Sequence, residues 1–397
     1  MTIKKILFAV AIGATVAVPA ALAQNVQIYG RLYPHLLNES GSGATPVGTP
    51  VATFAAGPTG TNGIGTTGMD SGNSRVGFRG QEDLGGGLKA IFQFEGVISV
   101  DESPAFSFNR DTFVGLTGGF GTVKLGRVDT IQKNYGDVIG IMGVSSGTFL
   151  SSAGVLRKAG FGTSNSSRFH ERSANSIQYE SPKISGFVAG LQYSTAEAAK
   201  TATRDPTSIS MGVKYEKGPL YAAIAHEIHN DLFGGSRNAP AAMSNFPVVN
   251  PTNSKDRATQ FTVAYRLDKK HRFAFDLIRK EYNENATVAG RFGSYENTAY
   301  MLSMDNRWSE QWRTSAYYAK ADAGSCTRIA AACVTDGLDG SKLSFGLGYN
   351  LSRRTMLFSA VSHLNNGKSA RYTSATFGAP NPGETITQYA LGLSHSF

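Results

Sequence analysis

The chain has 397 residues, a formal net charge of +9, and 46 glycines, 23 phenylalanines and 16 tyrosines spread along its whole length. Its basic residues alternate with apolar ones instead of forming one basic run, which argues against a nucleic-acid-binding protein. No linker or shift in composition divides the sequence, so we expect a single domain despite the length.

The N-terminus has the three parts of a secretory signal. Lys4 and Lys5 form the positive region, residues 6–18 form the apolar region, and Ala21-Leu22-Ala23 is a small-residue cleavage site. We therefore expect residues 1–23 to be removed and the mature domain to span 24–397, which lowers the formal charge from +9 to +7 because Lys4 and Lys5 are lost. No later stretch approaches the roughly 20 apolar residues of a membrane-spanning helix.

The first predicted strands each have one polar and one apolar face. Side chains alternate across a strand, so residues two apart share a face. In segments 26–33, 73–83 and 88–95, polar residues gather on one face: Tyr29, Arg31, Arg75, Arg79, Lys89 and Glu95. This pattern fits a soluble sandwich with its apolar face inside, and it fits equally a membrane barrel with its apolar face outside.

The connections between strands distinguish these two architectures. Alternating or apolar segments occur at 26–33, 73–83, 88–95, 109–116, 122–127, 176–179, 186–194, 208–216, 220–229, 261–267, 273–277, 298–304, 312–320, 342–350, 355–363 and 389–397. Short turns alternate with long loops, among them 38–72 and 130–171. Outer-membrane barrels have short periplasmic turns, long outer loops and an even strand number. We predict an all-β fold, a transmembrane antiparallel barrel of sixteen strands with a water-filled lumen.

Two cysteines, Cys326 and Cys333, lie in one polar loop. A cleaved signal implies an oxidising compartment, so we expect a local disulfide between them. Two cysteines alone make a poor zinc site, and we predict no metal and no cofactor.

Two motifs that could indicate an enzyme lack the required context. Gly143-Val-Ser-Ser-Gly147 matches Gly-x-Ser-x-Gly, but no helical pattern follows it, as a nucleophile elbow requires. His226 and His229 are three residues apart on a predicted strand, so their imidazoles face opposite sides. The sequence indicates that the chain is not an enzyme.

Several blocks resemble the general porins of Gram-negative outer membranes, specifically the beta-proteobacterial type. They are residues 28–31, 74–95, 113–116, 118–127 and 175–179 and the terminal Phe397. The resemblance covers the whole mature chain. It implies a homotrimer in the outer membrane, in contact with lipid and lipopolysaccharide, whose third outer loop folds into the lumen.

The resemblance also implies site residues. Arg31, Arg75, Arg110 and Arg172 would form a row at the constriction, opposite acidic groups on a loop spanning 130–171. In this chain that loop lacks the Pro-Glu-Phe tip of the enterobacterial relatives and offers only Asp137 and Glu171 against Lys133, Arg157, Lys158 and Arg168. Arg79, Lys124, Tyr29 and Lys89 would line the wall nearby. Phe397 would be the signal read by the barrel-assembly machinery.

These expectations describe a passive channel for small hydrophilic solutes and ions. Rings of arginine or lysine favour anions in a pore, so we expect an anion preference. Two other interpretations stay open at this level: a substrate-specific channel, and an adhesin or antigen whose barrel only displays its loops.

Overall fold

The computed structural model describes residues 26–53, 55–102, 106–161, 169–195, 206–231, 254–284 and 288–397. The predicted signal peptide and Arg168 lie outside these residues. One antiparallel sheet contains twenty hydrogen-bonded strands. They are β1 (Gln27–Leu32), β2 (His35–Ser42), β3 (Thr66–Asp70), β4 (Arg75–Gly85), β5 (Leu88–Ile98), β6 (Phe106–Ser107), β7 (Thr112–Gly118), β8 (Gly121–Asp129), β9 (Arg172–Glu180), β10 (Phe187–Thr195), β11 (Thr207–Lys217), β12 (Leu220–Asn230), β13 (Lys255–Arg266), β14 (His271–Asn283), β15 (Phe292–Arg307), β16 (Trp312–Ala321), β17 (Ser325–Arg328), β18 (Gly340–Asn350), β19 (Thr355–Asn366) and β20 (Thr385–Ser396).

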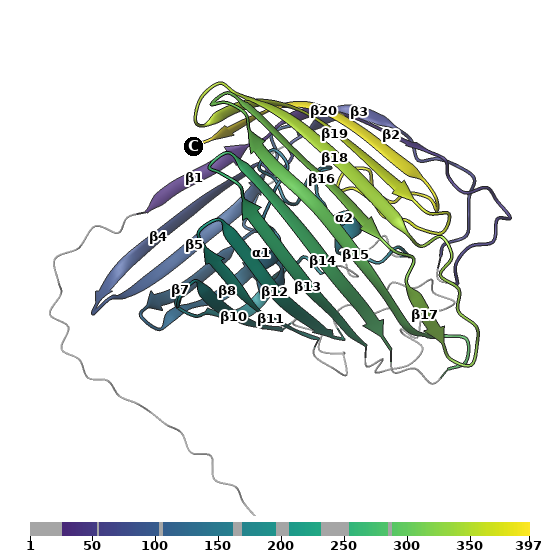
Figure 1. Ribbon diagram of the computed structural model, residues 1–397, viewed down its shortest axis with the longest axis horizontal. Helices are drawn as coiled ribbons and strands as arrows, with labels where there is room; N and C mark the ends of the chain where they lie inside the picture. Colours follow the sequence, from purple (N-terminus) through teal and green to yellow (C-terminus); the bar gives the residue numbers. More distant parts are fainter. Residues whose placement is uncertain are drawn as a thin grey trace, which may run out of the picture.

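These twenty strands form a closed barrel that has sixteen strands when interrupted strands are counted once. Four of the sixteen barrel strands are each interrupted once and so consist of two shorter strands, which pair one after the other with a shared neighbour. These pairs are β1 and β2, β3 and β4, β6 and β7, and β16 and β17. The barrel closes where the first strand, made of β1 and β2, pairs with the last strand, β20. The predicted barrel is confirmed, and the C-terminus lies at the end that carries the short turns (Figure 1).

The alternation along the strands separates an apolar outer face from a polar inner face. Leu302 on β15 is 55% exposed on the outside, whereas its neighbour Ser303 is 7% exposed inside. Gln192 on β10 and Gln260 on β13 are likewise buried on the inner side. Closure leaves no unpaired sheet edge, which is the condition for strands to span lipid.

The first long loop is shorter than the sequence predicted. The expected loop 38–72 includes the end of β2 and all of β3, which pair with each other over residues 35–39 and 66–70. The prediction was wrong here because His35–Ser42 shows no apolar alternation; β2 is held by an eight-residue ladder to β20. Non-local pairing overrides the local pattern.

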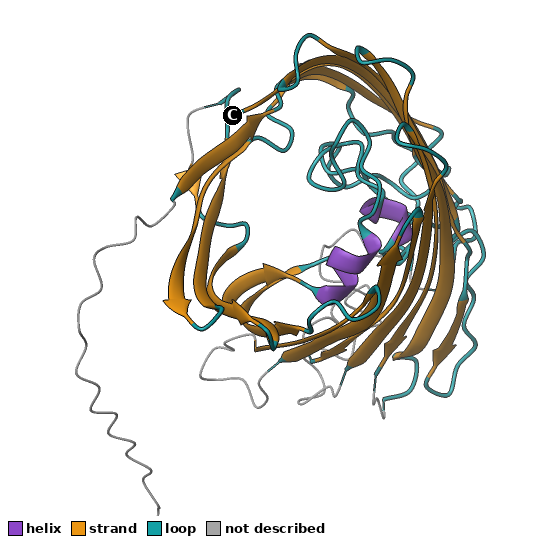
Figure 2. Cartoon of the chain, turned by 60° about the vertical axis from the view of Figure 1, so that its left-hand side comes forward, coloured by secondary structure: helices purple, strands orange, loops and turns teal. Residues whose placement is uncertain are grey.

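The loop between β8 and β9 spans 130–171, as predicted, and folds into the barrel. It contains the helices α1 (Ile131–Gly136) and α2 (Ala153–Leu156), which Figure 2 shows inside the ring of strands. We refer to this segment as the inner loop. Neither helix, nor any other helix in the described residues, is long and apolar enough to cross a membrane.

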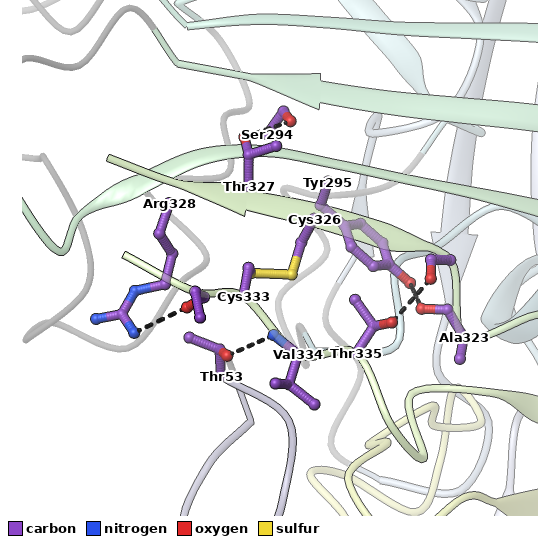
Figure 3. The surroundings of a disulfide bond; sticks show 12 residues. Thr53, Ser294, Tyr295, Ala323, Cys326, Thr327, Arg328, Cys333, Val334 and Thr335 are labelled. Atoms are coloured by element: carbon purple, nitrogen blue, oxygen red, sulfur yellow. Dashed lines mark hydrogen bonds between the residues drawn. A yellow bond between two sulfur atoms is a disulfide. The ribbon is translucent and has the colours of Figure 1, made fainter. Parts of the chain in front are cut away.

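Cys326 and Cys333 form a disulfide beside β17 (Figure 3). The segment after Cys333 is tied to the first long loop, because the amide of Val334 donates to the hydroxyl of Thr53 at 2.8 Å and the amide of Thr53 donates back to the Val334 carbonyl at 2.8 Å. Two outer loops that are distant in sequence are thereby joined.

Candidate pore constriction

The inner loop docks against one side of the barrel and leaves the other side open. α1 packs on β10 to β13, and α2 packs on β15, β16 and β18. Apolar residues of the loop, including Phe149, Leu156 and Phe161, form a core with the wall tyrosines Tyr282 and Tyr295 inside the lumen. The remaining passage therefore runs between the docked loop and the wall made by β1 and β4 to β9.

Glycines in the wall create the space for this docking. Gly190 and Gly212 are register partners on β10 and β11, and a Cβ on Gly190 would lie 2.6 Å from the hydroxyl of Tyr135 in α1. On β18, a Cβ on Gly346 would lie 2.7 Å from the side chain of Met142. Side chains at these positions would push the loop into the passage.

Two buried wall lysines hold the loop by its backbone. Lys280 on β14 donates to the carbonyl of Leu156 at 2.8 Å. Lys342 on β18 donates to the carbonyls of Phe149 and Ser151, the second at 3.0 Å. A buried carbonyl that loses its hydrogen-bond donor costs free energy, so both lysines stabilise the docked position.

The four predicted arginines all lie on the open wall. Arg31 on β1 and Arg75 on β4 are direct register partners, so they project into the lumen side by side. Arg172 begins β9, opposite Asp129 at the end of β8. Arg110 precedes β7 rather than lying within it, in an irregular segment that frees its side chain from strand alternation.

Glu95 on β5 is the centre of one half of this cluster. Its carboxylate accepts a hydrogen bond from the Tyr29 hydroxyl at 2.9 Å, lies 3.7 Å from the Arg75 guanidinium, and forms an ion pair with Arg110. Arg75 also donates to the side-chain oxygen of Asn73 at 2.5 Å. These contacts fix the orientation of the guanidinium groups.

Asp111 and Asp129 form the other half. Arg172 bridges them, with Nε at 2.6 Å from Asp111 and Nη2 at 2.8 Å from Asp129. Lys133, in the first turn of the inner loop, lies 2.8 Å from the same Asp129 carboxylate. The loop therefore begins with an ion pair to the wall.

Arg31 has no carboxylate among its described hydrogen-bond partners. It donates to the carbonyls of Gly143 at 2.7 Å and Met142 at 2.8 Å on the inner loop, and to the Ser394 hydroxyl at 2.9 Å. Its guanidinium also lies 4.4 Å from the centre of the Tyr33 ring. Arg31 therefore connects the wall to the loop, and no described carboxylate in these contacts neutralises its charge.

The constriction cluster, as we call it, has more cations than anions. Its cations are Arg31, Arg75, Arg110, Arg172 and Lys133, and its carboxylates are Glu95, Asp111 and Asp129. Three wall carboxylates pair with Arg75, Arg110 and Arg172 and partly neutralise them. The formal excess is two positive charges.

The ion-pair partners of Asp137 are residues of the inner loop and not the wall arginines. Its carboxylate is 3.0 Å from buried Arg157 and 2.7 Å from buried His170, on the side of the loop that packs against β13. Burial opposes ionisation of Asp137, but His170, Arg157 and Lys133 outweigh burial and hold the pKa of this carboxyl below its usual range. Burial lowers the pKa of His170 to about 4, despite the opposing attraction of Asp137.

The residues predicted to line the pore wall lie on β1, β4, β5 and β8. Arg79 lies 4.8 Å from the centre of the Tyr29 ring and donates to Gln27 at 2.9 Å. Lys124 lies 5.1 Å from the centre of the Phe113 ring. Lys89 is the register partner of Asp83 near the short-turn end.

Sequence reasoning missed the three wall carboxylates as partners of the arginines. Glu95 had a usable signal, since alternation placed it on the polar face of its strand. Asp111 had none, because it lies in the irregular segment before β7. Asp129 follows a register shift between Gly126 and Val128, which breaks the alternation along β8.

The described residues offer no cluster of three or more histidine, cysteine, aspartate or glutamate side chains that could hold a metal ion. The geometry instead defines a class of protein: a membrane-spanning barrel whose lumen is narrowed by an inward-folded loop opposite a cationic wall.

Comparison with known proteins agrees with this class. A family model described as Gram-negative porin matches residues 9–369, and the chain belongs to that family. It is an outer-membrane protein. It is 29% identical over 349 residues to outer membrane porin protein 32 of Delftia acidovorans, covering 84% of this chain and 87% of that one.

Two solved structures have the same fold. An anion-selective porin from Comamonas acidovorans aligns with a TM-score of 0.67 and 23% identity, covering 94% of this chain and 100% of the other. A trimer form of OmpT, an outer-membrane protein of Vibrio cholerae, aligns with a TM-score of 0.59 and 13% identity, covering 94% of this chain and 100% of the other.

Proposed function

We propose that this porin is a diffusion channel for small hydrophilic solutes that prefers anions. The observation that carries the proposal is the cationic excess of the constriction cluster, at the level where the inner loop narrows the lumen. A positive, low-dielectric constriction raises the local concentration of anions and excludes cations. The anion selectivity named for the Comamonas porin of the same fold supports the same conclusion.

The position of the loop carboxylate strengthens the proposal. Asp137 pairs with Arg157 and His170, two cationic or titratable residues of the loop itself, and with none of the wall arginines. The side of the loop that faces Arg31 contributes the carbonyls of Met142 and Gly143 instead. Carbonyl oxygens orient a guanidinium without cancelling its charge, so the loop leaves the positive potential of the wall in place.

The direct test is the zero-current potential of the purified channel in a planar bilayer across a KCl gradient. We expect the sign that reports chloride preference, with the largest effect in dilute salt because exposed charges are screened within about 3 Å at 1 M. Replacing Arg75 and Arg110 by serine should widen the passage and move selectivity toward neutral. A cation-selective wild-type channel would contradict the proposal.

We also propose that the channel is a homotrimer, as the trimer form of OmpT is. The protein should migrate as a heat-modifiable trimer after gentle extraction in detergent. Finding only monomers by light scattering in the same detergent would count against this assembly.

A further inference from the structure

A second group of basic residues lies among three neighbouring short turns. These turns join β13 to β14, β15 to β16, and β18 to β19. Between them is a polar cavity of about 790 Å³. Its charged lining consists of Lys269, Lys270, Arg307, Arg313, Arg353 and Glu310. We refer to it as the rim cavity.

In each turn, a short side chain accepts hydrogen bonds from two backbone amides of the same turn. Asp268 accepts from the amides of Lys270 and His271 at 2.6 and 2.7 Å. Ser309 accepts from Gln311 and Trp312 at 3.1 and 3.0 Å. Ser352 acts in the same way in the third turn. These bonds fix the turns, so the cations are held close together without a ligand.

Most of these cations lack a carboxylate partner in the protein. Arg313 pairs with Asp305 at 2.6 Å, but no described carboxylate lies within ion-pair distance of Lys269, Lys270, Arg307 or Arg353. Asp268, the nearest acid in sequence to the lysines, already accepts the two backbone amides. Five cations therefore face Glu310 as the one carboxylate in the cavity lining.

The rest of the same rim differs. Lys183, in the turn between β9 and β10, lies 3.5 Å from Glu216 at the next turn. The turn between β4 and β5 carries Asp83, which accepts the amide of Gly85 at 2.9 Å. The rim cavity therefore differs from these turns in gathering four cations that have no described ion-pair partner, namely Lys269, Lys270, Arg307 and Arg353.

We propose that the rim cavity binds a small multivalent oxyanion of the pyrophosphate class. Guanidinium groups match the oxygen geometry of such anions with two parallel hydrogen bonds, and lysines add adaptable point charges. Several converging cations favour a multivalent anion over chloride, because each additional negative charge gains a separate partner. The lining of the rim cavity shares no residue with the constriction cluster, so binding there can be measured separately from conduction through the pore.

The chain contains two tryptophans, and both lie beside the cavity-lining residues Ser309, Glu310 and Gln311. Trp308 and Trp312 flank the turn that carries Glu310, and the Trp308 indole donates to the Thr314 hydroxyl at 2.9 Å. Titration of the purified porin in detergent with sodium pyrophosphate should therefore give a saturable change in tryptophan fluorescence. Isothermal calorimetry on the same sample supplies the affinity independently.

Matched variants distinguish binding of pyrophosphate at the rim cavity from a general electrostatic attraction to the positively charged protein. Lys269→Gln with Lys270→Gln removes two charges from one short turn of the cavity, and adding Arg353→Gln removes a third. Lys183→Gln with Lys217→Gln removes two charges from other short turns of the same rim. We expect the cavity variants to weaken pyrophosphate binding at least tenfold and the control pair to leave it unchanged.

Three results would overturn the proposal: no saturable binding to the wild type, equal weakening in both pairs, or loss of the fluorescence titration on replacing Arg75 and Arg110 instead. Lys269→Arg with Lys270→Arg should retain binding, which excludes misfolding as the cause of any loss. A channel without anion selectivity would refute the proposed function while leaving these binding measurements valid.

Discussion

Glu95→Gln should make the channel more anion-selective. The substitution keeps the shape of the side chain and its capacity to accept the Tyr29 hydrogen bond, but it removes the carboxylate that lies 3.7 Å from Arg75 and pairs with Arg110. The formal excess of the constriction cluster rises by one positive charge. The test is therefore a change of charge with little change of structure.

The size of the effect follows from Coulomb's law. A unit charge ~7 Å from the path of an ion contributes ~0.6 kcal/mol in water and roughly half of that in 0.1 M salt, where the Debye length is about 10 Å. The charge acts with opposite sign on chloride and potassium, so their permeability ratio should rise about threefold. In 1 M salt the change should fall to about 1.2-fold.

The assay is the zero-current potential at several KCl concentrations, measured beside Glu82→Gln. Glu82 is exposed on the same strand, with the opposite parity to Arg75 and Arg79, so this control removes an equal charge outside the lumen. An unchanged ratio in Glu95→Gln, or an equal change in Glu82→Gln, would refute the assignment of Glu95 as the carboxylate that moderates the arginine row.

Three further predictions follow from the loop and the barrel seam. Lys342→Met should weaken loop docking by roughly 2–3 kcal/mol, because it leaves two buried carbonyls of the loop without their donor. Protease cleavage within the inner loop should then increase relative to the exposed-site control Lys320→Met. Burial lowers the pKa of His170 to about 4 in the docked loop. In a released loop His170 would have its ordinary pKa of about 6.5, so it would bind a proton below that pH while the docked His170 would not. Docking should be strongest above that pH and lose roughly 3 kcal/mol by pH 4, and His170→Asn should abolish this dependence of cleavage on pH. Deleting Phe397, whose backbone exchanges two hydrogen bonds of 3.1 Å with Gly30 at the seam, should reduce assembled protein in the outer membrane far more than export; normal membrane levels would remove its role as an assembly signal.

The sequence by itself determined the architecture and the position of the inner loop. Alternation is a local property with a period of two, so the faces of Arg31, Arg75 and Glu95 could be assigned within a few residues. Glycine-rich turns between alternating segments located the hairpins. The gap between two clear strands indicated a long loop, and the limits 130–171 came from the resemblance to porins. The strands β2 and β3 were missed because their apolar pattern is weak and their pairing is non-local.

Only the tertiary structure decided which charges meet. Arg172 and Asp111 are 61 residues apart in sequence, and their contact depends on how β7, β8 and β9 lie side by side. Asp137 looked like a lumen-facing acid, but docking of the loop places it in a buried cluster with Arg157 and His170. Charge pairing depends on distances across the barrel, and these are set by strand register, irregular segments and glycine recesses in the wall, which act between residues far apart in the chain.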